Sequence, residues 1–437
     1  MVMSTFSGIK NSALLITEKC ILLGLSFFNS VLLARVGGPE VFGQYAYILS
    51  MAGLFLPMTI MGLNNIVTKY IVKNPNNAHY YLKSAIIIRL YGALLAIALG
   101  LMLVLIISNP NNTYILLLIT LQSFSAFYVI EFFFLAKQQV SALLKVRLII
   151  LLVLNSLKCI VILNGASLNL LIMLQGLEYV LIGSIYLLTY VKGKNHHFIK
   201  RKTSSRSYIA LAQKGKWLLF SGIAATIYLK IDQIMLANII GINAVAYYAA
   251  AAKLSEVWYV FPVLIANAFT AQLSQLKFSN YLKYQNLLQQ LIVVLTLSAL
   301  ILSITTYFIA PALISLLYTD EYSASATILS IHIFASIFIF QRAILSKWLI
   351  IEKLYKYSLI SSVCGAITNI VLNAVLIPQY GGVGAAWATV ISYMIASYGF
   401  LFFHSNTKRY AQILHQAVLN FPALLKPFIK QLRLLKK

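Results

Sequence analysis

Residues 192–206 have the sequence KGKNHHFIKRKTSSR and separate two long apolar stretches, 168–191 and 216–240. A helix of more than 20 residues, rising about 1.5 Å per residue, is long enough to cross roughly 30 Å of hydrocarbon. A basic segment between two such stretches is typical of a cytoplasmic loop between transmembrane helices. This loop lies near the midpoint of the 437 residues, so the chain is predicted to consist of two halves of similar size.

The alternation of apolar and basic segments extends along the whole chain. Of the 34 Lys and Arg residues, 27 fall before the first apolar stretch, between even- and odd-numbered stretches, after the last, or in the ends of the stretches that border these segments, as Lys145, Arg147, Lys216 and Lys347 do. The alternate loops and the stretch ends that border them hold only Arg35. Cytoplasmic loops of membrane proteins carry such an excess of basic residues. The pattern therefore predicts an all-α polytopic membrane protein with twelve transmembrane helices and both termini in the cytoplasm. The stretches are 11–35, 41–64, 84–108, 114–136, 142–164, 168–191, 216–240, 244–271, 286–310, 326–349, 357–377 and 383–403.

The composition agrees with a membrane protein and argues against a nucleic-acid partner. Hydrophobic residues make up 61% of the chain and charged residues 10%, far from the shares usual in a soluble domain. The net charge of +25 is explained by the basic cytoplasmic loops. Cys20, Cys159 and Cys364 all fall inside apolar stretches and match no metal-binding or disulfide pattern. We therefore expect no metal and no cofactor.

The loops divide the chain into four parts. Residues 1–191 are predicted to form an N-terminal six-helix lobe, 192–215 a basic cytoplasmic linker, 216–403 a C-terminal six-helix lobe, and 404–437 a basic amphipathic tail. In the tail, apolar residues recur at helical spacing on both sides of Pro422. Both stretches are too short to span a bilayer, so we expect two helices that lie in the cytoplasmic interface.

The two halves show weak internal similarity. When the chain is shifted by 203 residues, Gly38 falls on Gly241, and Tyr45-Ala46 falls on Tyr248-Ala249. Pro57 and Pro262 lie inside apolar stretches at nearly corresponding places, and each is expected to interrupt its helix. Matching interruptions in repeated halves are typical of transporters that bind substrate between the halves. Chance similarity between apolar segments is the alternative interpretation.

Three motifs resemble those of a known family. The first is LARVGGPEVFGQY at 33–45, and the second is IYLKIDQIML at 227–236 followed by YYAAAAKLSE at 247–256. The third is NIVLNAVLIPQYGGVGAAWAT at 369–389. All three are similar to polysaccharide repeat-unit flippases of the O-antigen (Wzx) type. These flippases form the polysaccharide branch of the multidrug/oligosaccharidyl-lipid/polysaccharide exporter (MOP) superfamily.

The resemblance implies a fold and a function. The fold would be two six-helix lobes around a central cavity. The function would be a flippase that moves an undecaprenyl-pyrophosphate-linked oligosaccharide repeat unit from the cytoplasmic to the outer leaflet by alternating access. The resemblance places the protein in the bacterial inner (plasma) membrane, in O-antigen and lipopolysaccharide biosynthesis. It implies as partners a lipid-linked oligosaccharide, membrane lipids, a coupling proton or sodium ion, and the polysaccharide polymerase and chain-length proteins.

Ionisable residues inside the apolar stretches are the candidates for function. Each would cost about 2.5–3.5 kcal/mol at the centre of a bilayer. Most are therefore expected to face the interior of the helix bundle, a water-filled cavity or the headgroups. There are eleven: Glu18, Lys19, Arg89, Glu131, Lys158, Glu178, Lys230, Asp232, Lys253, Glu256 and Arg342.

Counting residues from the loops gives each charge a depth. Asp232 and Lys253 lie at similar distances from the outer turn near residue 242, close to the midplane, and Lys230 and Glu256 match slightly deeper. Arg89 and Glu131 also match in depth, whereas Lys158 and Glu178 match less well. Two interpretations stay open. The charges are structural ion pairs that fix helix register, or some of them line the cavity as a proton or cation relay.

Three basic residues are candidates for binding an anionic substrate: Arg342, Lys158 and Arg89. Arg342 has no acidic partner in its predicted hairpin and lies near the cytoplasmic leaflet. A guanidinium can bind a diphosphate through two parallel hydrogen bonds. The alternative for Arg342 is that its side chain reaches the lipid headgroups.

Two other functional classes remain as alternatives. A multidrug exporter of the same superfamily would have the same fold, although the motif at 369–389 argues against it. A membrane glycosyltransferase or polymerase would need acidic or basic catalytic residues on a sizeable outer loop. The chain has no Asp-x-Asp motif, and the predicted outer loops are a few residues long. We therefore expect that the protein is not an enzyme. The sugar composition, the coupling ion, the oligomeric state and the charges that face the cavity do not follow from the sequence.

Overall fold

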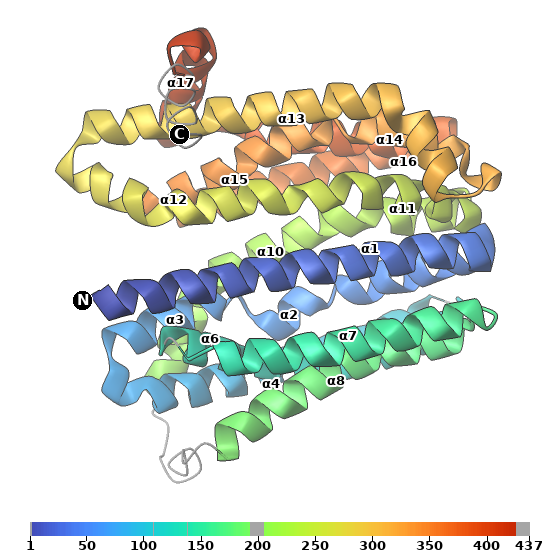
Figure 1. Ribbon diagram of the computed structural model, residues 1–437, viewed down its shortest axis with the longest axis horizontal. Coiled ribbons are helices and arrows are strands. Elements are labelled where there is room, and N and C mark those ends of the chain that lie inside the picture. Colours follow the sequence, from blue (N-terminus) through green and yellow to red (C-terminus); the bar gives the residue numbers. More distant parts are fainter. Residues whose placement is uncertain (1, 108, 138, 193–204, 425–437) are drawn as a thin grey trace. The chain divides into compact units, whose positions relative to one another are not determined.

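A computed structural model describes residues 2–107, 109–137, 139–192 and 205–424. These residues form helices, short 3₁₀ segments and turns, with no β-strand among them. The chain divides into two compact units, Met1–Ile234 and Met235–Lys437. The division falls within one helix, α10 (Ser205–Ile239). The predicted all-α membrane fold is thus confirmed for the described residues (Figure 1).

Unit 1 contains long apolar helices and several short ones. In chain order they are α1 (Val2–Gly53), α2 (Leu56–Ile60), α3 (Asn64–Lys73), η1 (Pro75–Asn77), α4 (Ala78–Ile106), α5 (Asn112–Gln122), η2 (Ser123–Tyr128), α6 (Val129–Ala136), α7 (Ser141–Leu163), α8 (Leu168–Lys192) and most of α10. Residues 193–204 of the cytoplasmic linker predicted at 192–215 lie outside the described residues, and 205–215 form the start of α10.

Unit 2 repeats this mixture of long and short helices. They are α11 (Ile242–Glu256), η3 (Val257–Tyr259), α12 (Val260–Ser279), α13 (Tyr281–Leu317), η4 (Asp320–Tyr322), α14 (Ala324–His332), α15 (Ala335–Ile351), α16 (Tyr355–Ser397), η5 (Gly399–Phe403) and α17 (Ser405–Leu419).

Two glycines reverse the chain inside the longest helices. With 52 residues, a straight α1 would be about 78 Å long, more than twice the thickness of the hydrocarbon core. Gly38 has φ +68°, a left-handed conformation that glycine adopts without a steric cost, and the chain turns back there toward α2 (Figure 1). Gly381 has φ +53° and interrupts the 43-residue α16 in the same way.

These two turns explain the number of candidate membrane-spanning segments. The described part of the chain has 10 helical segments that are long and apolar enough to cross a membrane. Two of them, Thr17–Ile60 and Tyr355–Phe403, contain Gly38 and Gly381. When each is divided at its glycine, the segments correspond to the twelve stretches predicted from the sequence.

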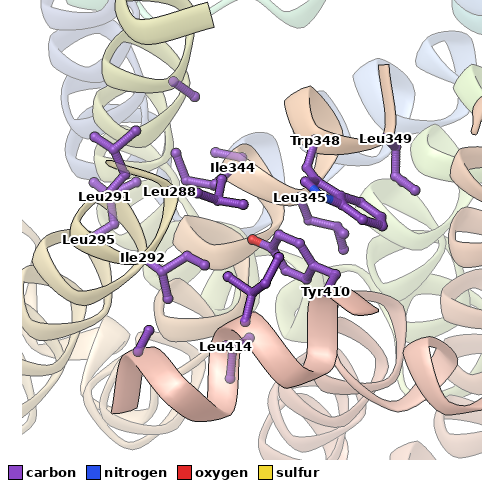
Figure 2. Close-up of a cluster of buried hydrophobic side chains, with 14 of the residues drawn as sticks. Leu288, Leu291, Ile292, Leu295, Ile344, Leu345, Trp348, Leu349, Tyr410 and Leu414 are labelled. Carbon is purple, nitrogen blue, oxygen red and sulfur yellow. The ribbon is translucent and has the colours of Figure 1, made fainter. Parts of the chain in front are cut away.

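The first tail helix is confirmed as α17, but its apolar face packs on protein. Tyr410 and Leu414 are buried against Leu345 and Trp348 of α15 (Figure 2). The rings of Tyr410 and Trp348 are 5.1 Å apart. α17 also packs against α13 and η5. The location of this helix at the cytoplasmic interface stays a prediction, and the second tail helix falls mostly on 425–437, outside the described residues.

Candidate functional site

The second span of unit 1 is interrupted where the sequence places a proline. α1 ends at Gly53, and Pro57 lies in the first turn of α2. A proline ring clashes with the carbonyl four residues earlier, here that of Gly53, so a continuous helix is unfavourable. A second interruption follows at Met61, which has φ 54°. The predicted helix break at Pro57 is thus present.

The fourth span of unit 1 is interrupted without a proline or a glycine. Residues Ser123–Tyr128 form the 3₁₀ segment η2 between α5 and α6. A 3₁₀ stretch inside a longer helix replaces i→i+4 hydrogen bonds by i→i+3 bonds and often marks a hinge. The sequence SFSAFY contains no residue that signals this change, so the interruption was not predicted.

Arg89 of α4 connects these two interrupted spans. Its guanidinium donates a hydrogen bond to the Asn64 side-chain oxygen, at the start of α3, and another at 3.4 Å to the carbonyl of Ser125 in η2. Arg89 is 1% exposed. Non-helical backbone at membrane depth must find other hydrogen-bond partners, and Arg89 supplies donors to both interruptions. We infer that Arg89 fixes the interrupted spans to each other.

Glu131 pairs with Arg147, whereas the sequence analysis matched it with Arg89. Arg147 Nη1 is 2.5 Å from a Glu131 carboxylate oxygen, and both Glu18 oxygens accept hydrogen bonds from Arg147 at 2.5 Å. Tyr186 donates a further hydrogen bond to Glu131 at 3.3 Å. Depth counting could not find this network because it ignores helix rotation. Arg147 was counted with the basic residues of the cytoplasmic loops and was not considered as a buried partner, although it lies in α7.

Lys158 and Glu178, for which the depths matched less well, form a salt bridge of 3.1 Å between α7 and α8. Gln175 accepts a hydrogen bond from Lys158 at 2.8 Å and another from the Tyr45 hydroxyl at 3.3 Å. Lys158 is 5% exposed. The ammonium is therefore surrounded by protein acceptors and is not open to a substrate in this structure.

Unit 2 has interruptions in its corresponding second and fourth spans. The 3₁₀ segment η3 separates α11 from α12, and Pro262 stands four residues after Trp258 of that segment, so the break predicted at this proline is also present. The other interruption is at Ile333 and Phe334, between α14 and α15. Ser303 of α13 donates a hydrogen bond to the Ile333 carbonyl at 3.1 Å.

A buried histidine, which the sequence analysis did not select, lies at the interruption between α14 and α15. His332 is the last residue of α14 and is 2% exposed. Its Nδ1 is 2.6 Å from the hydroxyl of Ser255, in the last turn of α11. The available signal was a single histidine inside an apolar stretch, and from sequence alone such a residue is indistinguishable from a packed core histidine.

Arg342 of α15 contacts both arms of α16. Its guanidinium donates hydrogen bonds to the hydroxyls of Ser361 and Ser362, before the Gly381 turn, and to the carbonyl of Ala396 after it. The Ala396 contact is 2.8 Å and the Ser362 contact 2.9 Å. The residue is partly buried. Arg342 therefore joins three spans of unit 2 and keeps part of its surface exposed.

The remaining predicted charges are divided between the two units. Asp232 is buried and belongs to unit 1, together with the partly buried Lys230. Lys253 and Glu256, both partly buried, belong to unit 2. The pairing of Asp232 with Lys253 stays a prediction. Among the described residues, no group of three or more His, Cys, Asp or Glu side chains is placed to hold a metal ion.

Comparison with known proteins places this arrangement in a family. Residues 9–270 match the family described as Polysaccharide biosynthesis protein, and residues 218–375 match the family described as MatE. A relative from Staphylococcus aureus, the capsular polysaccharide biosynthesis protein CapF, is 24% identical over 390 residues, which cover 87% of this chain and 95% of the relative.

Solved transporter structures share the fold. A multidrug resistance MATE family transporter of the MOP superfamily, in an inward-facing conformation, has a TM-score of 0.69 at 14% identity, over 91% of this chain and 96% of that one. The lipid II flippase MurJ, in an inward closed conformation, has a TM-score of 0.66 at 13% identity, over 95% and 98% of the two chains. The chain belongs to the polysaccharide biosynthesis protein family and has the transporter fold of the MOP superfamily.

Proposed function

We propose that this protein is a flippase that moves an undecaprenyl-pyrophosphate-linked oligosaccharide repeat unit from the cytoplasmic to the outer leaflet by alternating access. It would act in the bacterial inner (plasma) membrane, with both termini in the cytoplasm. The proposal rests on one combination: the chain matches a polysaccharide biosynthesis family and has the fold of a transporter. The basic loops support the orientation.

We propose Arg342 as the first contact for the anionic head of the substrate. Of the three candidate cations, Arg89 and Lys158 are 1% and 5% exposed, whereas Arg342 is only partly buried. The neighbouring hydroxyls of Ser361 and Ser362 could donate to phosphate oxygens once they turn from their present partners. A rigid guanidinium fork suits a diphosphate better than an ammonium does.

Drug export by a multidrug exporter of the same superfamily is the second candidate function. It is favoured by the match of residues 218–375 to the MatE family. The two functions need different substrates: a lipid-linked oligosaccharide in one case and drugs in the other. A strain that expresses the protein and gains no drug resistance would count against this candidate.

Deletion of the gene in its own host tests the proposed function. The flippase proposal predicts that surface polysaccharide disappears and that complete lipid-linked repeat units accumulate in the cytoplasmic leaflet. Expression of the intact chain should restore the surface polymer. Loss of surface polymer with only incomplete repeat units in the membrane would instead indicate a role in assembling the sugar, and the flippase proposal would be wrong.

A further inference from the structure

Three tyrosines pack together where η2 meets α8 in unit 1. The ring of Tyr128, at the end of η2, is stacked on that of Tyr179, with the ring centroids 6.4 Å apart. The Tyr128 centroid is also 5.8 Å from that of Tyr186, which lies on the same helix α8 as Tyr179. Tyr186 is buried, whereas Tyr128 and Tyr179 keep part of their surface exposed. The stacked pair is therefore an aromatic surface that a ligand can reach.

An ion-paired carboxylate lies beside each member of this pair. Glu131 follows the first tyrosine by one helical turn, and Glu178 directly precedes the second. Oε2 of each accepts from a cation of α7, which packs against α8 (Figure 1): Arg147 at 2.5 Å and Lys158 at 3.1 Å. Among the described residues, Oε1 of neither carboxylate has a hydrogen-bond partner, and the two side chains are 15% and 23% exposed. Each carboxylate thus has one acceptor oxygen available to a ligand.

This surface lies within the membrane-spanning part of unit 1. Tyr128 belongs to the interruption η2 of the fourth span, and irregular backbone at that depth occurs only where it is buried in protein or lines a water-filled cavity. Ionised side chains are also costly in contact with hydrocarbon. The exposed parts of Glu131 and Glu178 therefore face water and not lipid tails, as they must if the surface binds a polar ligand.

We propose that Tyr128, Tyr179, Glu131 and Glu178 form a binding site for the sugar part of a lipid-linked substrate, here called the tyrosine face. The identity of this ligand rests on the proposed flippase function. A sugar ring has a face of C–H groups, which packs on an aromatic ring. Its hydroxyl groups donate hydrogen bonds to carboxylate oxygens. The tyrosine face presents both partners side by side: a stacked aromatic pair and two carboxylates, each with an unused oxygen.

The charges of the tyrosine face favour an uncharged ligand. Arg147 also holds Glu18, so the ion pairs at this face leave an excess of negative charge, which repels a diphosphate. A cation would have to compete with Arg147 and Lys158 for carboxylates that these residues already hold at 3.1 Å or less. A sugar hydroxyl can donate to the second oxygen of each carboxylate and leave both ion pairs intact. The tyrosine face therefore suits the hydroxyl-rich part of the substrate and not its anionic head.

Saturation-transfer nuclear magnetic resonance tests the site without transport. The full chain in lipid nanodiscs is mixed with the oligosaccharide obtained by partial hydrolysis of the host's surface polysaccharide, and saturation of the protein's aromatic protons should transfer to the sugar protons. Tyr179→Leu should weaken binding roughly two- to tenfold, because it removes a stacking ring, whereas Tyr179→Phe should bind like the unaltered protein. Tyr128→Leu is the second variant. The control is Tyr91→Leu, a 68% exposed tyrosine of α4, which should change nothing.

Two results of this experiment would overturn the proposal. The first is no saturation transfer to the oligosaccharide in the unaltered protein. The second is equal affinity in Tyr179→Leu, Tyr128→Leu and the unaltered protein. Tetraphenylphosphonium, an organic cation, is the comparison ligand. If it receives saturation that Tyr179→Leu abolishes, while the oligosaccharide receives none, the tyrosine face binds cations and the assignment to sugars is wrong.

A transport assay separates the failure of this site from the failure of the proposed function. In proteoliposomes with an undecaprenyl-pyrophosphate-linked repeat unit, Tyr179→Leu should raise the KM for translocation roughly two- to tenfold, because it removes binding to the sugar. Tyr179→Phe and Tyr91→Leu should keep the KM of the unaltered protein. An unchanged KM in Tyr179→Leu would overturn the role of the tyrosine face in transport. If the unaltered protein moves no lipid-linked sugar at all, the proposed function fails, while the resonance experiment still decides whether the tyrosine face binds sugars.

Discussion

Arg147 holds two carboxylates, those of Glu18 and Glu131, through three contacts of 2.5 Å. It therefore joins α7 to α1 and α6 within unit 1. Glu18 is buried, and a buried carboxylate without a partner is strongly destabilising. At the scale of single residues, charged side chains that are energetically costly in a membrane are stabilised by networks of ion pairs and hydrogen bonds.

Replacement of Arg147 by Ala is expected to destabilise the protein by about 3–5 kcal/mol, because two carboxylates lose their partner. Arg147→Lys should recover part of this loss, since a single ammonium cannot bind both oxygens of Glu18 in parallel. Thermal unfolding in detergent measures the effect. Lys19→Ala is the control, because Lys19 is exposed next to Glu18. Equal unfolding temperatures for Arg147→Ala and Lys19→Ala would contradict the network.

Arg342 gives a prediction for substrate binding. Arg342→Ala should abolish export of surface polysaccharide in a flippase-deficient strain, and Arg342→Lys should restore only part of it, because Lys offers a point charge instead of a fork. Protein levels must be measured in parallel, since Arg342 also joins α15 to α16. Lys347→Ala, on the same helix, is the matched control. Full export by Arg342→Ala would eliminate the proposed contact with the substrate.

At the scale of helices, α17 is held to unit 2 by apolar packing. The Tyr410 hydroxyl is buried and has no hydrogen-bond partner among the described residues, whereas its ring packs on Trp348 (Figure 2). Tyr410→Phe should therefore be neutral or stabilising. Tyr410→Ala should cost about 3–5 kcal/mol. Protease sensitivity of the tail reports the docking of α17, and a large loss of protection in Tyr410→Phe would show that the hydroxyl matters.

The sequence predicted the helices better than their interruptions. The apolar stretches located the spans, and Gly38 and Gly381 lie at the turns between paired spans. Pro57 and Pro262 predicted two interruptions through their known clash with the preceding turn. The interruptions at Ser123–Tyr128 and at Ile333 contain no glycine or proline, and they depend on side chains from other helices.

The buried contacts were predicted only in part, for a geometric reason. Counting residues gives the depth of a charge but not the direction in which it points around its helix. Depth alone matched Glu131 with Arg89, whereas the structure pairs it with Arg147. The Lys158–Glu178 salt bridge was ranked as the weaker match because the counted depths of the two residues differ. Contacts between distant spans, such as that of Ser255 with His332, require the packed structure.

At the scale of the whole molecule, the basic loops predict the orientation in the membrane. In a chain without its native cysteines, Glu321→Cys should react with a membrane-impermeant thiol reagent added outside cells. Asn76→Cys should react only after the membrane is opened. Both positions are exposed, so accessibility of the side chain is not limiting. Labelling of position 76 in intact cells would contradict the predicted topology.

If the chain moves a lipid-linked sugar across the bilayer, the movement must be measurable in proteoliposomes that contain only the purified protein. Purified protein is reconstituted with a fluorescent undecaprenyl-pyrophosphate oligosaccharide, and an impermeant sugar-modifying enzyme reports the fraction that is accessible outside. A flippase should make the accessible fraction continue to rise after the enzyme is added, faster than in liposomes without protein or with Arg342→Ala. An accessible fraction that stays fixed at the outer-leaflet value, as in empty liposomes, would contradict the flippase function.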